Sequence, residues 1–338
     1  MLAPLPIFAI RDKAVRGRYI VSVLLFSALA AAAPQDPLQL KVDVALTALN
    51  VYVDDASGKP VTNLTRNDFT IFEDGQPREI QAFESAESPY HLLLLFDRSS
   101  STEDQWPYLV RALSRFLERL PTQHRVAVAA FDDKPEMLFN WTSPREFSRR
   151  GFGIQSNSAG TNLYGALEWA ASELRKIKGR KGVIAFTDGV DNRLSKKLVS
   201  FDRNGTPRVA PMENDDDFQK MLRTITAARS PVYFVAVNTD KNPDPREPYN
   251  SFNEKQRQAA RLRMQMVADR SNGVLHLPMQ IEDVEALYAT IGQELGNSYS
   301  LAFTPAKFVP DGSFHTIEVR VRDKSLRATQ SREGYYAR

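Results

Sequence analysis

Cysteine is absent from the 338 residues of this sequence. Disulfide bonds, thiolate metal ligands and cysteine nucleophiles are therefore excluded, and the fold has to rely on its hydrophobic core. Histidine is also scarce, because only four are present, and they lie far apart at positions 91, 124, 276 and 315. A zinc site needs clustered histidine or cysteine ligands, and this spacing does not provide them.

The N-terminal apolar run is too short for an ordinary membrane span. It extends from Tyr19 to Ala33 and has 15 residues, whereas a membrane-spanning helix needs about 20. Four basic residues precede it, namely Arg11, Lys13, Arg16 and Arg18. This pattern is typical of a secretory signal peptide, which we predict at residues 1–33, so we expect a secreted or periplasmic protein. The basic segment is long, so an uncleaved N-terminal membrane anchor is the alternative.

The sequence has little excess of either charge. It contains 44 basic and 41 acidic residues, of which four basic and one acidic residue lie within the predicted signal peptide. The remainder has 40 of each, so the pI of 8.9 belongs largely to the leader. Nucleic-acid binding relies on a basic surface, and we therefore expect no nucleic-acid partner.

From residue 90 onward, apolar runs alternate with segments whose apolar residues recur at helical spacing. The expected strands are 91–97, 125–131, 136–141, 182–187, 231–237 and 274–278, and the expected helices are 104–120, 163–177, 218–228, 254–270 and 282–295. This alternation predicts an α/β domain over residues 90–297, with a doubly wound, mostly parallel sheet flanked by helices. The charges of the 254–270 helix are expected to form a solvated face.

Residues 38–86 and 298–338 show the alternation of apolar and polar residues that is typical of β-strands. In the first segment, Asp74-Gly75 separates Phe69–Phe72 from Glu79–Phe83, which predicts a β-hairpin. Neither segment is large enough to form a stable sheet alone. We therefore predict that the two segments pair into one small β-sandwich-like module, with the α/β domain inserted between them.

Oxygen-bearing side chains follow the ends of two expected strands. Asp97, Ser99 and Ser101 form a D-x-S-x-S pattern after the first buried strand, Asp188 follows another, and Thr161 precedes a helix. Ligands of an open α/β sheet bind beyond the carboxyl ends of its strands, so we expect these five side chains at one edge. Each segment alone also suits a helix N-cap or a turn. Together, and in this order, they favour a metal site.

Three hydroxyls and two carboxylates suit a hard divalent cation. Mg²⁺ prefers about six oxygen ligands, so five leave one position open. Neutral hydroxyl ligands leave the ion electron-poor, which favours an anionic oxygen supplied from outside. We therefore predict Mg²⁺, with Mn²⁺ or Ca²⁺ as alternatives, and a protein partner that offers an Asp or Glu carboxylate.

Several neighbours of this pattern have two possible roles. Asp132, Asp133 and Asp191 are interpreted as solvated acids, of which Asp191 is the best candidate to tune the site. Trp141 and Tyr164 are expected either to contact a partner at the rim or to pack within the fold.

The segments DRSSS, GTNLYGAL and FTDGVDN resemble the metal-ion-dependent adhesion site of von Willebrand factor type A domains. The resemblance covers about residues 90–297 and implies that Asp97, Ser99, Ser101, Thr161 and Asp188 hold the ion. The flanking motifs DFTIFEDG and DGSFHTIEV further resemble the VWFA-related proteins of acidobacteria, which implies a bacterial source.

These features predict a binding protein that recognises its partner through the metal, and not an enzyme. A structural component of the cell envelope, with a metal that only braces the fold, is the alternative. A metal-dependent hydrolase is a weaker one, because D-x-D-x-T, G-x-S-x-G, Walker A and H-E-x-x-H motifs are all absent.

Overall fold

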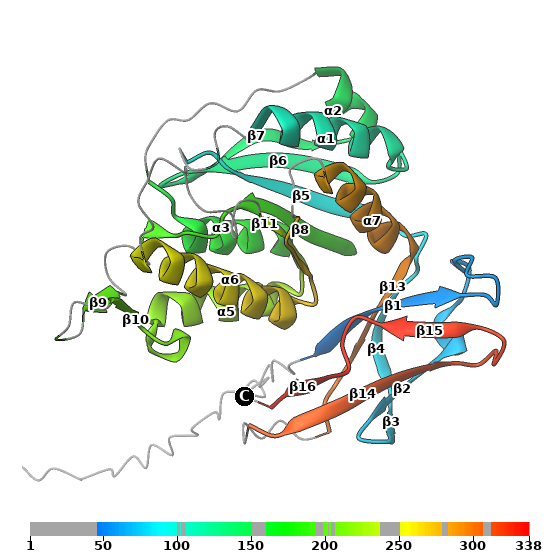
Figure 1. The fold of residues 1–338 in the computed structure, drawn as a ribbon. Coiled ribbons are helices and arrows are strands. Elements are labelled where there is room, and N and C mark those ends of the chain that lie inside the picture. Colours follow the sequence, from blue (N-terminus) through cyan, green and yellow to red (C-terminus); the bar gives the residue numbers. More distant parts are fainter. Residues whose placement is uncertain are drawn as a thin grey trace, which may run out of the picture. The chain divides into compact units, whose positions relative to one another are not determined.

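The computed structural model describes residues 46–99, 102, 106–150, 160–192, 199–201, 203, 207–236, 251–278, 283–306 and 312–337 (Figure 1). The predicted signal peptide at 1–33 and the predicted ligand Ser101 lie outside the described residues. No helix among the described residues is long and apolar enough to cross a membrane.

A six-stranded sheet forms the centre of the α/β part. Its strands are β5 (Tyr90–Asp97), β6 (Arg125–Phe131), β7 (Pro135–Thr142), β8 (Arg180–Thr187), β11 (Val232–Ala236) and β12 (Leu275–His276). Their order is β12-β11-β8-β5-β6-β7, and all neighbours are parallel except β7, which runs antiparallel at one edge. The middle of each central strand is apolar because both faces of the sheet are covered, and the polar residues stand at the strand ends.

Helices pack on both faces of this sheet (Figure 1). The elements are α1 (Trp106–Arg119), α2 (Pro144–Arg150), α3 (Leu163–Arg175), α5 (Asp216–Ala228), α6 (Ser251–Ser271) and α7 (Asp283–Asn297). One core joins α1 and α7 to Leu92, Leu94 and Phe96 of β5, and the other joins α3, α5 and α6 to Leu93 and Leu95. Successive strand residues therefore point to opposite faces, and the predicted fold class is confirmed.

The solvated face expected for the 254–270 helix is only partly present. Met264, Val267 and Ala268 of α6 are buried against the sheet, as an amphipathic helix requires. Arg263 is also buried, with 5% of its surface exposed, and its Nε lies 3.7 Å from a carboxylate oxygen of Asp215. A buried charge of this kind needs a partner that the helical pattern by itself does not reveal.

The two flanking segments form a two-layer β module. One sheet has the order β15-β1-β13-β4 and the other β16-β14-β2-β3. The strands are β1 (Thr47–Asp54), β2 (Phe69–Glu73), β3 (Gln76–Arg78), β4 (Ile80–Glu84), β13 (Ser298–Phe303), β14 (Phe314–Val321), β15 (Arg327–Gln330) and β16 (Gly334–Tyr336). β1 pairs with β13, and β2 pairs with β14, so each sheet contains strands of both segments. The β-sandwich-like module that we predict from the two flanking segments is therefore present.

The expected hairpin at Asp74-Gly75 is correct in its turn but wrong in its second strand. Asp74 and Gly75 have φ angles of 49° and 74°, as a two-residue hairpin turn requires. The strand that pairs with β2 is β3, immediately after the turn. Residues 80–84 form β4 instead, which joins the other sheet and pairs with β13. A two-residue turn can only pair the residues that directly flank it, so a partner starting at residue 79 was too far along the chain.

The motifs DFTIFEDG and DGSFHTIEV lie side by side, because they contribute the adjacent strands β2 and β14. Asp74 Oδ2 lies 2.7 Å from His315 Nδ1, and Asp74 Oδ1 accepts a hydrogen bond from the Thr316 backbone N–H at 2.8 Å. These hydrogen bonds lower the pKa of Asp74. The two motifs therefore fasten the β2–β3 turn to the start of β14.

Smaller elements complete the fold. They are the 3-10 helices η1 (Arg66–Asp68) and η3 (Met212–Asn214) and the antiparallel pair β9 (Val199–Phe201) and β10 (Pro207–Val209).

Arg180, the first residue of β8, joins the α/β part to the β module. Only 3% of its surface is exposed. Its Nη1 donates to the backbone oxygens of Ala86 at 2.7 Å and of Ser88 at 3.3 Å, where the chain enters β5. Its Nη2 donates to the Leu295 backbone oxygen and to Ser298 Oγ, where the chain leaves α7 for β13. One guanidinium thus binds both crossings of the chain between the two parts.

We predict that Arg180→Met lowers the free energy of unfolding by about 3 kcal/mol, because several buried carbonyl oxygens lose their donor. Urea unfolding at neutral pH measures this loss. Lys178→Met, in the exposed loop just before β8, is the matched control and should change stability by less than about 0.5 kcal/mol. Equal stability of the two variants would show that the guanidinium does not hold the crossings together.

A second prediction concerns His124, which precedes β6 and is 2% exposed. Its Nδ1 accepts a hydrogen bond from the Tyr90 backbone N–H at 3.1 Å. Burial, together with the charges of Arg180 and His91, lowers the pKa of His124 to about 4. Unfolded histidine has a pKa of about 6.5, so the unfolded chain binds more protons between these two values. Stability should therefore fall as the pH decreases through this window, by up to about 1.4 kcal/mol per pH unit.

Urea unfolding of the wild type and of His124→Asn between pH 7 and pH 4 tests this, because asparagine can accept the same hydrogen bond but does not titrate. The variant should lose less stability on acidification than the wild type. Parallel pH profiles would assign the acid sensitivity to other groups.

Candidate metal centre

The two predicted carboxylates lie at the same edge of the sheet. Asp97 ends β5, Asp188 directly follows β8, and these two strands are parallel neighbours. Only 1% of the surface of Asp97 is exposed, and Asp188 is half-buried. The parallel register therefore brings residues 91 positions apart in sequence to one place.

Asp97 is held in position by hydroxyl and amide donors. Its Oδ1 accepts a hydrogen bond from the Ser99 backbone N–H at 3.0 Å, and its Oδ2 accepts one from Thr187 Oγ1 at 2.7 Å. Burial, and after it the nearby charge of Asp188, raise the pKa of Asp97 to about 7, against the lowering effect of these hydrogen bonds and of the Ser99 side chain. Two carboxylates at this depth make an edge that favours a positive charge.

The Thr161 loop lies over the same edge. The Asn162 backbone N–H donates to the Asp132 backbone oxygen at 2.7 Å, and the Asn192 backbone N–H donates to the Thr161 backbone oxygen at 2.8 Å. Asp132 follows β6 and Asn192 lies in the loop after β8, so the Thr161 loop connects the strand ends on either side of β5. Thr161 itself is buried, with 6% of its surface exposed.

Gly160 allows this close approach of the loop. A Cβ atom at this position would lie 1.9 Å from Asp133 Oδ1, 2.6 Å from Asp133 Cγ and 2.9 Å from Asn192 Nδ2. Asn192 Nδ2 in turn donates to Asp133 Oδ1 at 3.1 Å. A side chain at this position would therefore have to displace the Asp133 carboxylate and the Asn192 amide, which contact each other at the rim.

The described predicted ligands thus share the carboxyl edge around β5, whereas Ser101 lies outside the described residues. Ser99 is 2% exposed and immediately follows the β5 end. No three His, Asp or Glu side chains gather into a metal-binding group among the residues that the structure describes. A cation at this edge therefore depends on the hydroxyls of Ser99 and Thr161 in addition to the two carboxylates. This oxygen donor set fits a hard divalent cation such as Mg²⁺.

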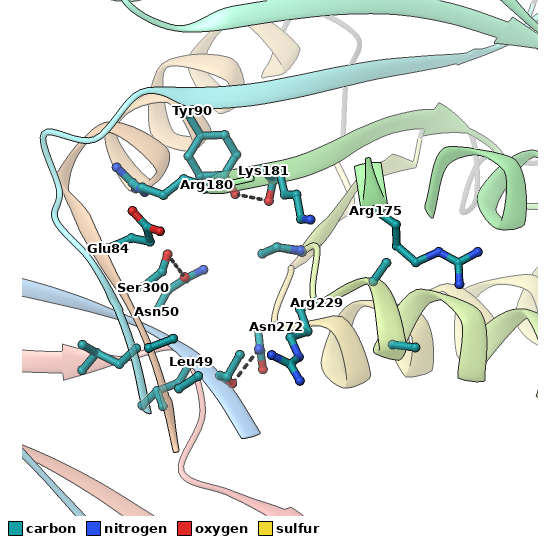
Figure 2. A pocket seen from close by; sticks show the side chains of 18 residues that line it. Leu49, Asn50, Glu84, Tyr90, Arg175, Arg180, Lys181, Arg229, Asn272 and Ser300 are labelled. Atoms are coloured by element: carbon teal, nitrogen blue, oxygen red, sulfur yellow. Dashed lines mark hydrogen bonds between the residues drawn. The ribbon is translucent and has the colours of Figure 1, made fainter. Parts of the chain in front are cut away.

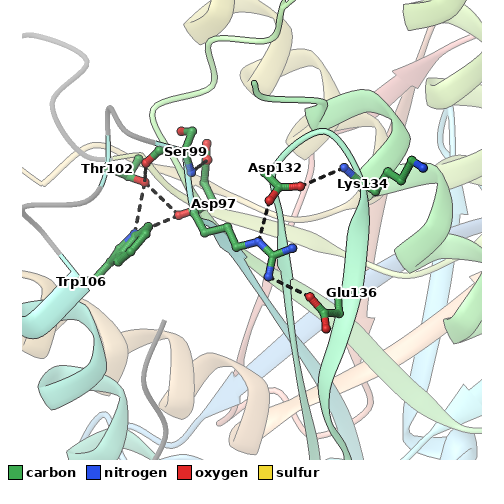
Figure 3. Close-up of polar contacts among 8 residues, drawn as sticks. Asp97, Ser99, Thr102, Trp106, Asp132, Lys134 and Glu136 are labelled. Carbon is green, nitrogen blue, oxygen red and sulfur yellow. Dashed lines mark hydrogen bonds and ion pairs between the residues drawn. The ribbon is translucent and has the colours of Figure 1, made fainter. Parts of the chain in front are cut away.

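The residues that support Asp97 were not all predicted. Thr102 Oγ1 donates to the Asp97 backbone oxygen at 2.8 Å, and Trp106 Nε1 donates to the same oxygen at 3.1 Å (Figure 3). Thr187 is equally absent from the sequence interpretation, although a hydroxyl beside Asp188 at a strand end is a signal that could have revealed it. These three side chains fix the position of the carboxylate and of the turn that follows it.

Arg98, which directly follows Asp97, is buried and pairs with two carboxylates. Its side chain is 9% exposed, and its Nε lies 2.9 Å from Asp132 Oδ2 and its Nη1 2.8 Å from Glu136 Oε2 (Figure 3). Asp132 is therefore not the solvated acid that the sequence predicts, because it pairs with a buried guanidinium. The ion pair directs the positive charge of Arg98 toward β6 and β7.

The other neighbours also have structural roles. Asp191 is 1% exposed, so it is not solvated, and its Oδ2 accepts a hydrogen bond from the Tyr164 backbone N–H at 3.3 Å. Tyr164 is buried and its hydroxyl donates to Asp215 Oδ2 at 3.1 Å, which supports the packing role. Trp141 packs against the ring of His91, near the opposite ends of the strands, with centroids 5.5 Å apart. Of the three acids Asp132, Asp133 and Asp191, Asp133 alone is exposed, as predicted.

Comparisons with solved structures find domains of related architecture. BatB from Bacteroides thetaiotaomicron is 16% identical, with 61% of this chain and 97% of that chain covered and a TM-score of 0.41. The vWF domain of the type V pili tip protein Mfa5 from Porphyromonas gingivalis is 12% identical, with 61% and 95% covered and a TM-score of 0.42. A von Willebrand factor type A protein from Catenulispora acidiphila is 11% identical, with 79% and 72% covered and a TM-score of 0.46.

A search among curated proteins found no match. The narrower resemblance to bacterial VWFA-related proteins stays a prediction. A family model described as von Willebrand factor type A domain matches residues 92–190, a segment that begins in β5 and includes Asp97, Ser99, Ser101, Thr161 and Asp188. Residues 92–190 of this chain therefore belong to a von Willebrand factor type A domain.

Proposed function

We propose that this chain is an exported binding protein that recognises a partner protein through a divalent cation. Asp97, Ser99, Ser101, Thr161 and Asp188 would hold the ion, which is Mg²⁺ in this proposal. An Asp or Glu carboxylate of the partner would complete its coordination. The proposed export rests on the signal-peptide pattern of residues 1–33.

The observation that carries this proposal is the buried Asp97 carboxylate beside Asp188. The pKa of Asp97 is raised to about 7 because burial and the charge of Asp188 both disfavour its ionisation. Without a cation, this edge repels any third carboxylate. With a divalent cation, the same edge attracts one. The arrangement therefore makes recognition of an acidic side chain dependent on the metal.

The surroundings of the edge support the same function. Arg98 is the nearest arginine in sequence, but its guanidinium is engaged by Asp132 and Glu136. Its charge is therefore not available to take the place of a cation beside Asp97. Asn162 and Asn192 lie half-buried at the rim, where their amides hold the loops around the proposed ion. Fixed loops of this kind pre-organise the oxygen ligands before a partner binds.

We predict that the wild type binds Mg²⁺ at one site, and that Asp97→Asn and Thr161→Ala each weaken this binding by more than about tenfold. Isothermal titration calorimetry measures the affinity. The increase of the melting temperature with Mg²⁺, an independent readout, should vanish in both variants. Asp133→Asn removes an exposed acid from the same edge and is the matched control. Unchanged Mg²⁺ binding in Asp97→Asn and Thr161→Ala would refute the proposed ligand set.

We further predict that a partner protein, captured on the immobilised mature chain from a cell-envelope extract with Mg²⁺, is released by EDTA. It should bind again when Mg²⁺ is restored, and immobilised Ser99→Ala should capture at least about tenfold less of it. Carbodiimide coupling of glycinamide to the carboxylates of the captured partner should abolish its rebinding. If the variant binds Mg²⁺ poorly but retains the partner equally well, the metal only braces the fold.

A further inference from the structure

A cavity of about 420 Å³ lies at the opposite end of the parallel sheet from Asp97 (Figure 2). Its floor is the outer face of the β15-β1-β13-β4 sheet, where Asn50, Glu84 and Ser300 alternate with residues of the sandwich core. Its other wall contains Arg180 and Lys181 at the start of β8, together with the C-terminal ends of α3 and α5. This volume lies within the range of about 300–1,000 Å³ that is usual for small-molecule sites.

The charged groups of the cavity are mostly positive. Arg175, Arg180, Lys181 and Arg229 line it, against the single carboxylate of Glu84. Arg180 donates to backbone oxygens at the junction, and Lys181 Nζ donates to the backbone oxygens at the end of α3. Arg175 and Arg229 are exposed, and no ion pair or hydrogen bond of their guanidiniums is found within the described part of the chain. They are the cations that remain available to a ligand.

The positions of these two arginines have a simpler partial explanation. Arg175 is the last residue of α3, and Arg229 is the C-cap of α5. A cation near a helix C-terminus interacts favourably with the helix dipole. This effect accounts for basic residues at the two helix ends. It does not account for the position of Arg229, whose side chain extends beside Asn272 at the same cavity, whereas that of Arg175 extends away from Asn272 (Figure 2).

The cavity also offers a buried acceptor without a donor. Asn272 Nδ2 donates to the Ala48 backbone oxygen at 2.6 Å, which fixes the orientation of the amide. Its Oδ1 is buried and has no hydrogen-bond partner in the described part of the molecule. On the floor, Ser300 Oγ donates to Asn50 Oδ1 at 3.1 Å. A ligand that carries a hydroxyl satisfies the Asn272 oxygen, and a buried acceptor without a donor otherwise destabilises the fold.

We propose that this cavity binds a small polyhydroxylated anion, namely a sugar that carries a carboxylate or a phosphate. The anionic group pairs with Arg229, whose planar guanidinium suits both kinds of oxyanion. The sugar hydroxyls donate hydrogen bonds to Asn272 Oδ1 and to the carboxylate of Glu84. The charge of Glu84 repels a simple anion, but its oxygens accept hydrogen bonds from hydroxyl groups. Ala48, Ala82 and Ala302 leave room for the ring above the β-sheet floor. This site is independent of the proposed metal centre.

Titration of the mature chain with galacturonate and with galactose 6-phosphate, followed by calorimetry and by backbone amide NMR shifts, tests the proposal. At least one of them should bind and shift the amides of residues that line the cavity, and the stronger of the two identifies the anionic group. Neutral galactose should bind at least about tenfold more weakly, since it lacks the charge-assisted hydrogen bonds. EDTA should leave the binding unchanged, which separates this site from the metal centre.

Arg229→Gln should weaken the binding of the charged sugar about tenfold, the effect of one lost charge-assisted hydrogen bond. Arg175→Gln should weaken it less, because the Arg175 side chain extends away from Asn272. Arg223→Gln, an exposed residue of α5 outside the cavity, should bind like the wild type. Because all three arginines are exposed, circular dichroism should show unchanged folding. Absence of binding by both sugars at about 10 mM would overturn the proposal. Binding by Arg229→Gln as tight as that by the wild type, or acetate and inorganic phosphate binding as tightly as the sugars, would also overturn it.

Discussion

The buried guanidinium of Arg180 is the contact on which the relation between the two parts of this fold depends. The α/β domain is inserted into a β module, so the chain crosses between them twice. Arg180 donates hydrogen bonds to backbone oxygens at the entry, near Ala86, and at the exit, near Leu295. Its Cζ also lies 5.0 Å from the ring centroid of Tyr90, the first residue of the first inserted strand. A charge this deeply buried is tolerated because Nη1 and Nη2 both donate to oxygens of the junction, although Nε has no hydrogen-bond partner among the described residues. The junction therefore tolerates little displacement.

The two ends of the parallel sheet have opposite electrostatic characters. At the carboxyl end, Asp97 and Asp188 create an edge that favours a cation. At the amino end, Arg175 and Arg229 open onto a cavity beside the β module. The position at the carboxyl end follows from the general rule for open α/β sheets. The cavity at the amino end exists only because the inserted domain rests against another sheet, and it therefore is a property of this particular assembly of parts.

Much of the sequence interpretation holds because its signals are local. The apolar run of β5 needs both faces covered, and the strand and helix alternation that follows leaves few topologies for the sheet. Paired strands also explain why neither flanking segment could be stable alone. The errors arise where a partner lies far away in sequence. Asp132 looked solvated until Arg98 was seen to pair with it, and residues 80–84 looked like a hairpin strand until β13 was seen beside them.

By itself, the sequence predicted an oxygen ligand set, since D-x-S-x-S, the threonine loop and Thr-Asp-Gly are adjacent to recognisable strand ends. It also determined the fold class, because periodicity and burial are properties of each segment. Only the tertiary structure decided the environment of those ligands. The pKa of Asp97 depends on its burial and on Asp188, 91 positions away, and the donor from Thr187 reaches it across a strand boundary. Desolvation and charge act through space, so a sequence can name such groups but cannot place them together.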